Sequence, residues 1–143
     1  MAENTIIPEK IKLFNIEVVN TYINDDTIND NLNLEFSVAH NTKHNLKDER
    51  VKIELFINLL SQEEIGVKFH IDFHFVIKDL SDQYKLNETN IPVFSHQFIA
   101  TLLGISFSTA RGLIFQQLQD TNFKGMILPV VSPFRMLESR KSE

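Results

Sequence analysis

The sequence predicts an α+β fold, in which a four-stranded antiparallel meander sheet is followed by C-terminal helices. Apolar residues alternate with polar residues at a period of two through the first half of the chain, and they recur at helical spacing only near its end. Strands that precede helices, without alternation of the two, are typical of an antiparallel sheet. We expect residues 1–143 to form one domain, since domains cluster at roughly 100–150 residues.

Four segments have the strand pattern, and each would bury one face. In the last of the four, apolar residues occupy the odd positions, while Lys, His and Asp residues occupy most of the even ones. In the first, the apolar residues change phase near Leu13 and Phe14, which predicts a β-bulge there. The predicted strands are 11–22, 32–39, 51–59 and 67–78.

Polar connectors separate these strands. They are rich in residues whose side chains bond to nearby backbone, and they are short enough to join consecutive strands as a meander. The strand pattern lapses over 79–92, so we expect this connection to lead from the sheet edge to the helices. The predicted connectors are 24–31, 40–48 and 61–66.

Two helical segments follow in the sequence. Ser95 is placed to cap the first segment, which Gly104 would end, and Ser106 or Ser108 would cap the second. One apolar stripe of the second segment would face the core. That stripe consists of Phe107, Ala110, Ile114 and Leu118.

The segment 126–131 is apolar and is followed by Pro133. Because Pro129 and Pro133 cannot lie inside a further helix, we expect this segment to be extended over the sheet or beside the helix. Its burial would draw on Ile127, Leu128 and Val130.

The composition argues against catalysis. The chain has no cysteine, no glycine-rich phosphate loop and no serine in a nucleophile-elbow pattern. We therefore expect a binding protein rather than an enzyme, with no cofactor. The net charge of −5 gives no general attraction for nucleic acid or anionic lipid.

The N-terminus has neither the basic start nor the apolar run of a signal peptide, and we expect no segment that spans a bilayer. Together with the missing cysteines, these features predict a cytoplasmic protein without membrane insertion.

A group of residues in the last third of the chain resembles a known pattern. Leu103 and Gly104 precede the run Phe-Ser-Thr-Ala-Arg at 107–111, and apolar residues and a Pro-Val step follow at compatible spacing. With four strands ahead of it, this arrangement resembles the SecB-type protein-export chaperones. The later matching residues are Ile114, Leu118, Phe123, Leu128, Pro129, Val130 and Val131.

The resemblance implies an ATP-independent holdase that keeps unfolded polypeptides from aggregating and that acts in protein transport. Such proteins are dimers of dimers with long apolar grooves, so it implies a homodimer or homotetramer. Its implied partners are unfolded or precursor polypeptides and the translocase motor SecA. The candidate client-binding residues are Phe56, Leu60, Phe73, Phe75, Phe107 and Phe123.

Two departures from the family pattern bear on its partners. The family has an acidic sheet face that helps to engage SecA, whereas basic residues and histidines dilute that face here. The tail 134–143 also lacks the cysteine and histidine of many members. A chaperone for export and one associated with a toxin–antitoxin pair both remain open. The diluting residues are Lys68, His70, His74 and Lys78.

Other interpretations start from single strands. Phe56 and Leu60 lie on the strand face opposite Ile53, Leu55 and Ile57, so both faces of this strand are apolar. We favour burial in a subunit interface or under a helix over a client groove, because exposed apolar patches are limited on monomers. A purely structural oligomerisation module is a further alternative.

His70, Asp72 and His74 share one strand face, where two imidazoles and a carboxylate could bind a metal. A small metal-binding protein or enzyme is therefore a second alternative. We favour a solvated polar face and assign no metal site, since zinc sites need a further ligand and a second shell that one strand cannot supply.

Structural roles are predicted for three residues near the end of the long helical pattern. Arg111 would tie the helix to the segment after it, because internal arginines are normally paired. Gly112 costs about 1 kcal/mol in a helix relative to alanine, which predicts close backbone packing around it. Pro129 keeps the segment after the helix from continuing as helix.

Overall fold

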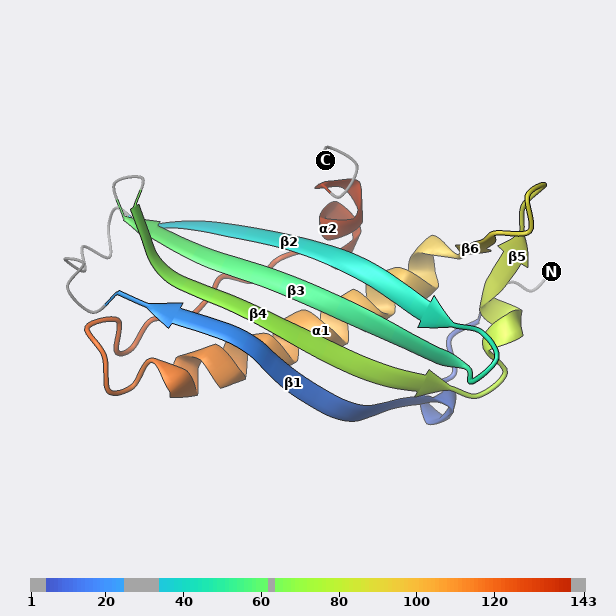
Figure 1. Cartoon of the computed structure of the whole chain (residues 1–143), viewed down its shortest axis with the longest axis horizontal. Helices are drawn as coiled ribbons and strands as arrows, with labels where there is room; N and C mark the ends of the chain where they lie inside the picture. The colour runs from blue at the N-terminus through green and yellow to red at the C-terminus, as the bar shows by residue number, and fades with distance from the viewer. Residues whose placement is uncertain (1–4, 25–33, 62–63, 140–143) are drawn as a thin grey trace.

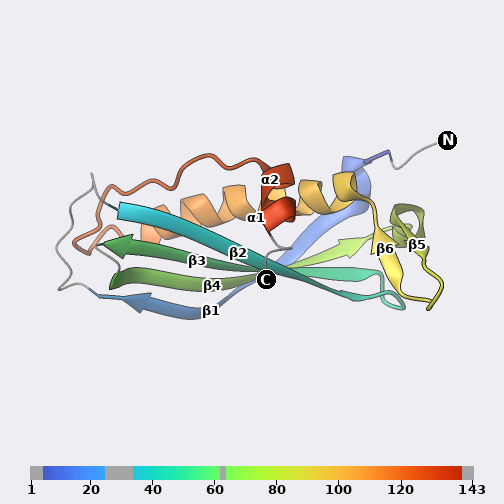
Figure 2. The same cartoon turned by 90° about the horizontal axis from the view of Figure 1, so that it is seen from above.

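A sheet and a long helix form two layers in the computed structural model, which describes residues 5–24, 34–61 and 64–139 (Figures 1 and 2). The helix runs diagonally across one face of the sheet. In the described residues no element covers the other face (Figure 2). The sheet contains β1 (Ile11–Ile23), β2 (Leu34–Asn45), β3 (Arg50–Ser61) and β4 (Glu64–Ile77).

The strand order is β1-β4-β3-β2, and all three pairings are antiparallel. This sheet and the helices after it confirm the predicted α+β fold class. The meander holds for β2, β3 and β4, but β1 pairs with β4 at the far edge, so the expected pairing of the first two strands is wrong. Most of the connector predicted between them falls on 25–33, outside the described residues, as does the predicted strand start at residue 32.

The second strand is longer than its sequence pattern. β2 continues to Asn45 through most of the predicted connector 40–48, and only 46–49 form the turn. Every second residue from His40 onward faces the helix layer, in register with buried residues of β3. His40 is only 4% exposed, and its Nε2 donates a hydrogen bond to Met136 O at 2.6 Å. This buried contact explains why a polar segment remains a strand.

The predicted bulge in β1 is confirmed, since the β1–β4 register shifts between Leu13 and Asn15. A second shift between Val18 and Asn20 was not predicted. The two bulges bring apolar residues from both phases of the sequence pattern to the helix face.

The long helix α1 (His96–Gln117) is continuous, so the predicted break at Gly104 is wrong. Both predicted segments present apolar residues to the sheet on one stripe, and that burial offsets the propensity cost of a single glycine. The predicted cap is confirmed, because Ser95 Oγ accepts a hydrogen bond from Phe98 N at 3.1 Å. The buried residues of α1 are Phe98, Ile99, Ala100, Leu102, Leu103, Ser106, Phe107, Ala110 and Ile114.

By length and composition α1 could cross a membrane, which corrects the expectation that no segment could. Half of the 18-residue apolar stretch of α1 that passes this test is buried within the protein. Core helices pass the same test of length and composition, and packing on the sheet accounts for the apolar residues of α1.

Short elements complete the chain between sheet and helix. The 3-10 turns η1 (Pro8–Lys10) and η3 (Leu80–Gln83) lie at one end of the sheet, where Lys10 Nζ pairs with Asp79 Oδ2 at 2.7 Å. The predicted connection 79–92 also contains strand β5 (Tyr84–Leu86), which pairs with β6 (Pro92–Phe94) in a small separate hairpin.

After α1, the chain runs back alongside the helix to α2 (Pro133–Ser139) (Figure 2). We call residues 126–132, which have no regular secondary structure, the crossover segment. Of the three residues expected to be buried there, Leu128 is buried, while Ile127 is 62% exposed and Val130 82% exposed. The burial predicted for those two side chains is therefore wrong in the single chain.

Candidate functional site

Apolar side chains remain exposed in the helix layer, above a core of buried side chains from the sheet and α1. An open cleft of about 630 Å³ lies between α1 and α2. Small residues of α1, including Gly104 and Ser108, form its floor, and Phe134, which is 55% exposed, lies among its lining residues. Ile127 and Val130 on the crossover segment are exposed as well, so Phe134 is one of several exposed apolar side chains of the helix layer.

The floor of this cleft depends on a close helix contact. A Cβ added to Gly104 would lie 3.3 Å from Pro133 Cγ, closer than most Cβ contacts. Glycine at this position therefore lets the start of α2 approach α1. The sequence pattern assigned Gly104 to a helix end, because a packing glycine and a terminating glycine look alike without knowledge of what lies opposite.

Of the three residues with predicted structural roles, Arg111 and Pro129 lie at the crossover segment, while Gly112 is exposed on α1. Arg111 Nε donates a hydrogen bond to Leu128 O at 3.0 Å, so the side chain ties α1 to that segment. Pro129 is exposed and follows this contact directly. The close packing expected around Gly112 is not found, since a Cβ there would meet nothing within 4 Å.

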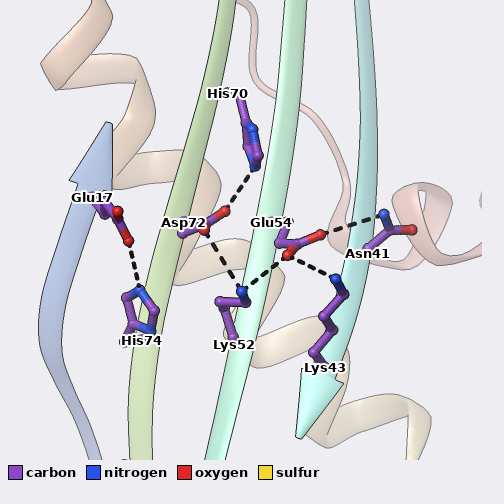
Figure 3. Close-up of polar contacts among 8 residues, drawn as sticks. All are labelled: Glu17, Asn41, Lys43, Lys52, Glu54, His70, Asp72 and His74. Carbon is purple, nitrogen blue, oxygen red and sulfur yellow. Dashed lines mark hydrogen bonds and ion pairs between the residues drawn. The ribbon is translucent and has the colours of Figure 1, made fainter. Parts of the chain in front are cut away.

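The uncovered face of the sheet has a polar centre, drawn in Figure 3. Glu54 Oε2 forms ion pairs with Lys52 Nζ at 3.1 Å and with Lys43 Nζ at 3.3 Å. Lys52 Nζ also lies 3.7 Å from Asp72 Oδ2. The side chains of Glu54 and Asp72 are only 8% exposed, although no described element covers this face. Burial alone would raise the pKa of the Glu54 carboxyl, but hydrogen bonds and charge attraction from Lys52 and Lys43 hold that pKa below its usual value.

His70 and His74 lie on this same face but contact different residues (Figure 3). His70 Nε2 donates to Asp72 Oδ1 at 2.9 Å, and the ring stacks on Phe56 with centroids 4.3 Å apart. His74 instead faces Glu17 on the neighbouring strand. The two imidazoles that the sequence placed together thus do not converge on one point.

The six predicted client-binding residues are split between two environments. Phe56 and Leu60 are half-buried on the uncovered sheet face, where a partner can reach them. The other four belong to the core between sheet and helix and present almost no surface in this conformation. Those four are Phe73, Phe75, Phe107 and Phe123.

Large apolar side chains are also exposed along β1, an edge strand of the sheet. In the described residues β1 pairs with a strand on one side only, and residues on both of its faces reach solvent. Sequence periodicity could not show this, since it does not indicate which strand lies at the edge. The exposed residues are Phe14, Ile16, Val18, Val19 and Tyr22.

A four-stranded antiparallel sheet, crossed on one face by a long helix and followed by a short second helix, defines this chain as an α+β protein with a SecB-like fold. Among solved structures, it is similar to the SecB-like chaperone Rv1957 of Mycobacterium tuberculosis, determined in complex with a ChAD peptide from the antitoxin HigA1. The match has a TM-score of 0.55 and 8% sequence identity, and it covers 87% of this chain and 93% of the other. At this identity the likeness shows the fold alone.

No protein-family model matches the chain, and no curated protein sequence matches it significantly.

Proposed function

We propose that this protein is an ATP-independent chaperone that binds unfolded polypeptides through the apolar surface of its helix layer. The observation that carries the proposal is the exposure of Phe134 in the α1–α2 cleft and of Val130 and Ile127 on the crossover segment that leads to α2. An extended client segment would cover these side chains, and each Å² of apolar surface so buried contributes about 25 cal/mol. The similar fold of a chaperone solved with a bound peptide supports the same function.

The proposed client contacts differ from those implied by the sequence. Four of the predicted contact residues are buried in the core, namely Phe73, Phe75, Phe107 and Phe123. Exposed residues of α2 and the crossover segment would contact the clients instead. The uncovered sheet face around Phe56 and Leu60 offers a second, smaller apolar area. Because the chain is acidic overall and the client surface is apolar, client binding is expected to depend weakly on salt.

The test is suppression of aggregation of a chemically denatured enzyme, followed by light scattering without nucleotide. Phe134→Ser is expected to weaken client binding by about tenfold, since burying a phenylalanine contributes about 1.5–3 kcal/mol. Ile91→Ser is the matched control, because Ile91 is equally exposed at 55% but lies between β5 and β6, away from the cleft. Both variants are first checked for unchanged circular dichroism and unfolding.

A wild-type protein that leaves aggregation unchanged at a severalfold molar excess would overturn the proposed function. Equal weakening by the two variants would place client binding elsewhere on the surface.

Protein export together with SecA is a second candidate role. The resemblance implies it, because the family engages SecA with the help of an acidic sheet face. Here Glu54 and Asp72 of that face are partnered by Lys52 and His70. We therefore favour a cytoplasmic chaperone that does not require SecA. Calorimetric titration with purified SecA tests this choice, and salt-sensitive binding that Glu54→Lys abolishes would restore the export role.

A further inference from the structure

Three potential metal ligands from two strands meet on the uncovered sheet face. Glu17, Asp72 and His74 each offer one ligand atom, and these atoms lie within 4.8 Å of one another. Glu17 and Asp72 are directly opposite in the β1–β4 register, and His74 is two residues beyond Asp72, so all three lie on one face (Figure 3). The sequence could not bring Glu17 to this group, because the pairing of β1 with β4 was not expected.

The histidine of this group has a free ligand atom. His74 Nε2 is buried, and in the described part of the chain it has no hydrogen-bond partner. It lies 3.5 Å from Glu17 Oε1, longer than the usual hydrogen bond of about 2.9 Å. Ligands held at about 2.0–2.2 Å by a tetrahedral zinc ion are roughly 3.3–3.6 Å apart, so this spacing suits two ligands of one ion.

The strand pairing also favours a cation at this point. Two carboxylates directly opposite on adjacent strands repel each other, and an ion shared between them would offset that repulsion. The two register shifts of β1 fall on either side of Glu17. β-bulges commonly re-aim a side chain beside a functional site, which matches the turn of Glu17 toward His74.

The remaining contacts of Asp72 orient it. His70 Nε2 donates to Asp72 Oδ1 at 2.9 Å, which fixes the carboxylate as an outer-shell partner fixes a metal ligand. Lys52 Nζ is 3.7 Å from Asp72 Oδ2 and competes with a cation for it. On the other side of the group, the ring of Phe14 lies beside that of His74, tilted by 50° with the centroids 6.0 Å apart.

We propose that Glu17, Asp72 and His74 form a zinc-binding site, with the fourth position open to water. Imidazole nitrogen with carboxylate oxygen suits Zn²⁺, whereas Ca²⁺ and Mg²⁺ prefer oxygen ligands alone. The site lies on the opposite side of the sheet from the client surface of the helix layer, and zinc binding does not rest on the proposed chaperone function.

Calorimetric titration of the tag-free full chain with Zn²⁺ tests the site. The expected result is one bound ion per chain, with affinity lowered more than tenfold in His74→Asn and in Glu17→Gln. Lys52→Gln is expected to raise the affinity, because it removes the competitor for Asp72. His96→Asn is the matched control, since His96 is exposed at the start of α1, and it is expected to bind as wild type.

Co²⁺ provides a second readout, because a four-coordinate ion gives intense visible absorption bands that His74→Asn would abolish. Circular dichroism establishes that each variant is folded. Absence of binding at 100-fold molar excess, equal binding by wild type and His74→Asn, or weaker binding by Lys52→Gln would each overturn the proposal.

Discussion

At the scale of single residues, capping gives α1 a defined start. Ser95 satisfies one of the unpaired backbone amides of the first turn through its hydrogen bond from Phe98 N. The same residue connects the helix to the preceding 3-10 turn, because Ser95 N donates to Gln83 O at 2.9 Å. Only the side-chain contact is lost on substitution by alanine.

Ser95→Ala is expected to lower the free energy of unfolding by about 1 kcal/mol, the usual cost of losing an N-cap. Urea denaturation followed by circular dichroism measures it. Ser108→Ala, at an exposed position inside α1, is the control and is expected to be neutral or slightly stabilising because alanine is the better helix former. An equal loss in both variants would show that the cap contributes nothing.

The buried carboxylate of Glu54 links stability to pH. Its pKa is lowered in the folded protein, so its stabilising contribution is present above the unfolded pKa and is lost as the pH falls through the folded value. Glu54→Gln is therefore expected to cost about 1 kcal/mol at pH 7 and to flatten the decline in stability below about pH 4.5. Urea unfolding at pH 7, 5, 4 and 3 measures both effects.

Glu35→Gln provides the control for that series, because Glu35 is exposed on the same sheet face and has no ion pair with any described residue. A wild-type acid profile in Glu54→Gln would show that the Lys52–Glu54–Lys43 cluster is not the source of the pH dependence.

At the scale of elements, the two glycines of α1 have opposite surroundings. Gly112→Ala meets open space and is expected to stabilise the protein by about 0.5–1 kcal/mol, since alanine is the better helix former. Gly104→Ala has the same gain in propensity but must displace Pro133, so its net gain is expected to be smaller. Thermal unfolding of both variants compares them, and an equal gain would mean that α2 moves away without cost.

How much of these elements the sequence predicts depends on the range of the contacts that define them. Alternation identified β3 and β4, and the helical stripe identified the buried face of α1, because each pattern repeats within one element. The continuation of β2 depends on His40 meeting Met136, and the partner of β1 lies more than forty residues away in sequence. Such contacts leave no local pattern.

The candidate site follows the same rule. Arg111 was recognised as a tie because an arginine between apolar neighbours is locally conspicuous, whereas the exposure of Val130 and Phe134 depends on where the chain turns back beside α1. The sequence predicted burial for Val130 and assigned no role to Phe134.

At the scale of the whole molecule, the apolar edge strand predicts self-association. β1 presents exposed apolar side chains and, as far as the described residues show, unpaired backbone groups at its outer edge, a combination that soluble proteins usually cover. Light scattering at micromolar concentration is expected to give a multiple of 16.6 kDa, with dimer as the minimum. Val18→Asp is expected to shift the mass toward monomer, with Asn20→Asp on the same strand as its control.

A monomer mass for the wild-type protein would contradict this prediction. If Val18→Asp assembles as the wild type does, another surface forms the interface, such as the exposed side of α1 at Phe115.

The position of β1 in the strand order also sets a sequence of events during synthesis. Of the four strands β1 is synthesised first, yet β4, its one neighbour among the described strands, is completed about fifty residues later, roughly 3–10 s at 5–20 residues per second. In the interval β2 and β3 can form their hairpin locally, while β1 has not yet met its partner.

Pulsed hydrogen exchange during refolding is expected to show β1 amides protected after those of β3. A newly made chain therefore passes through a stage in which its own first strand is an aggregation-prone segment awaiting a partner.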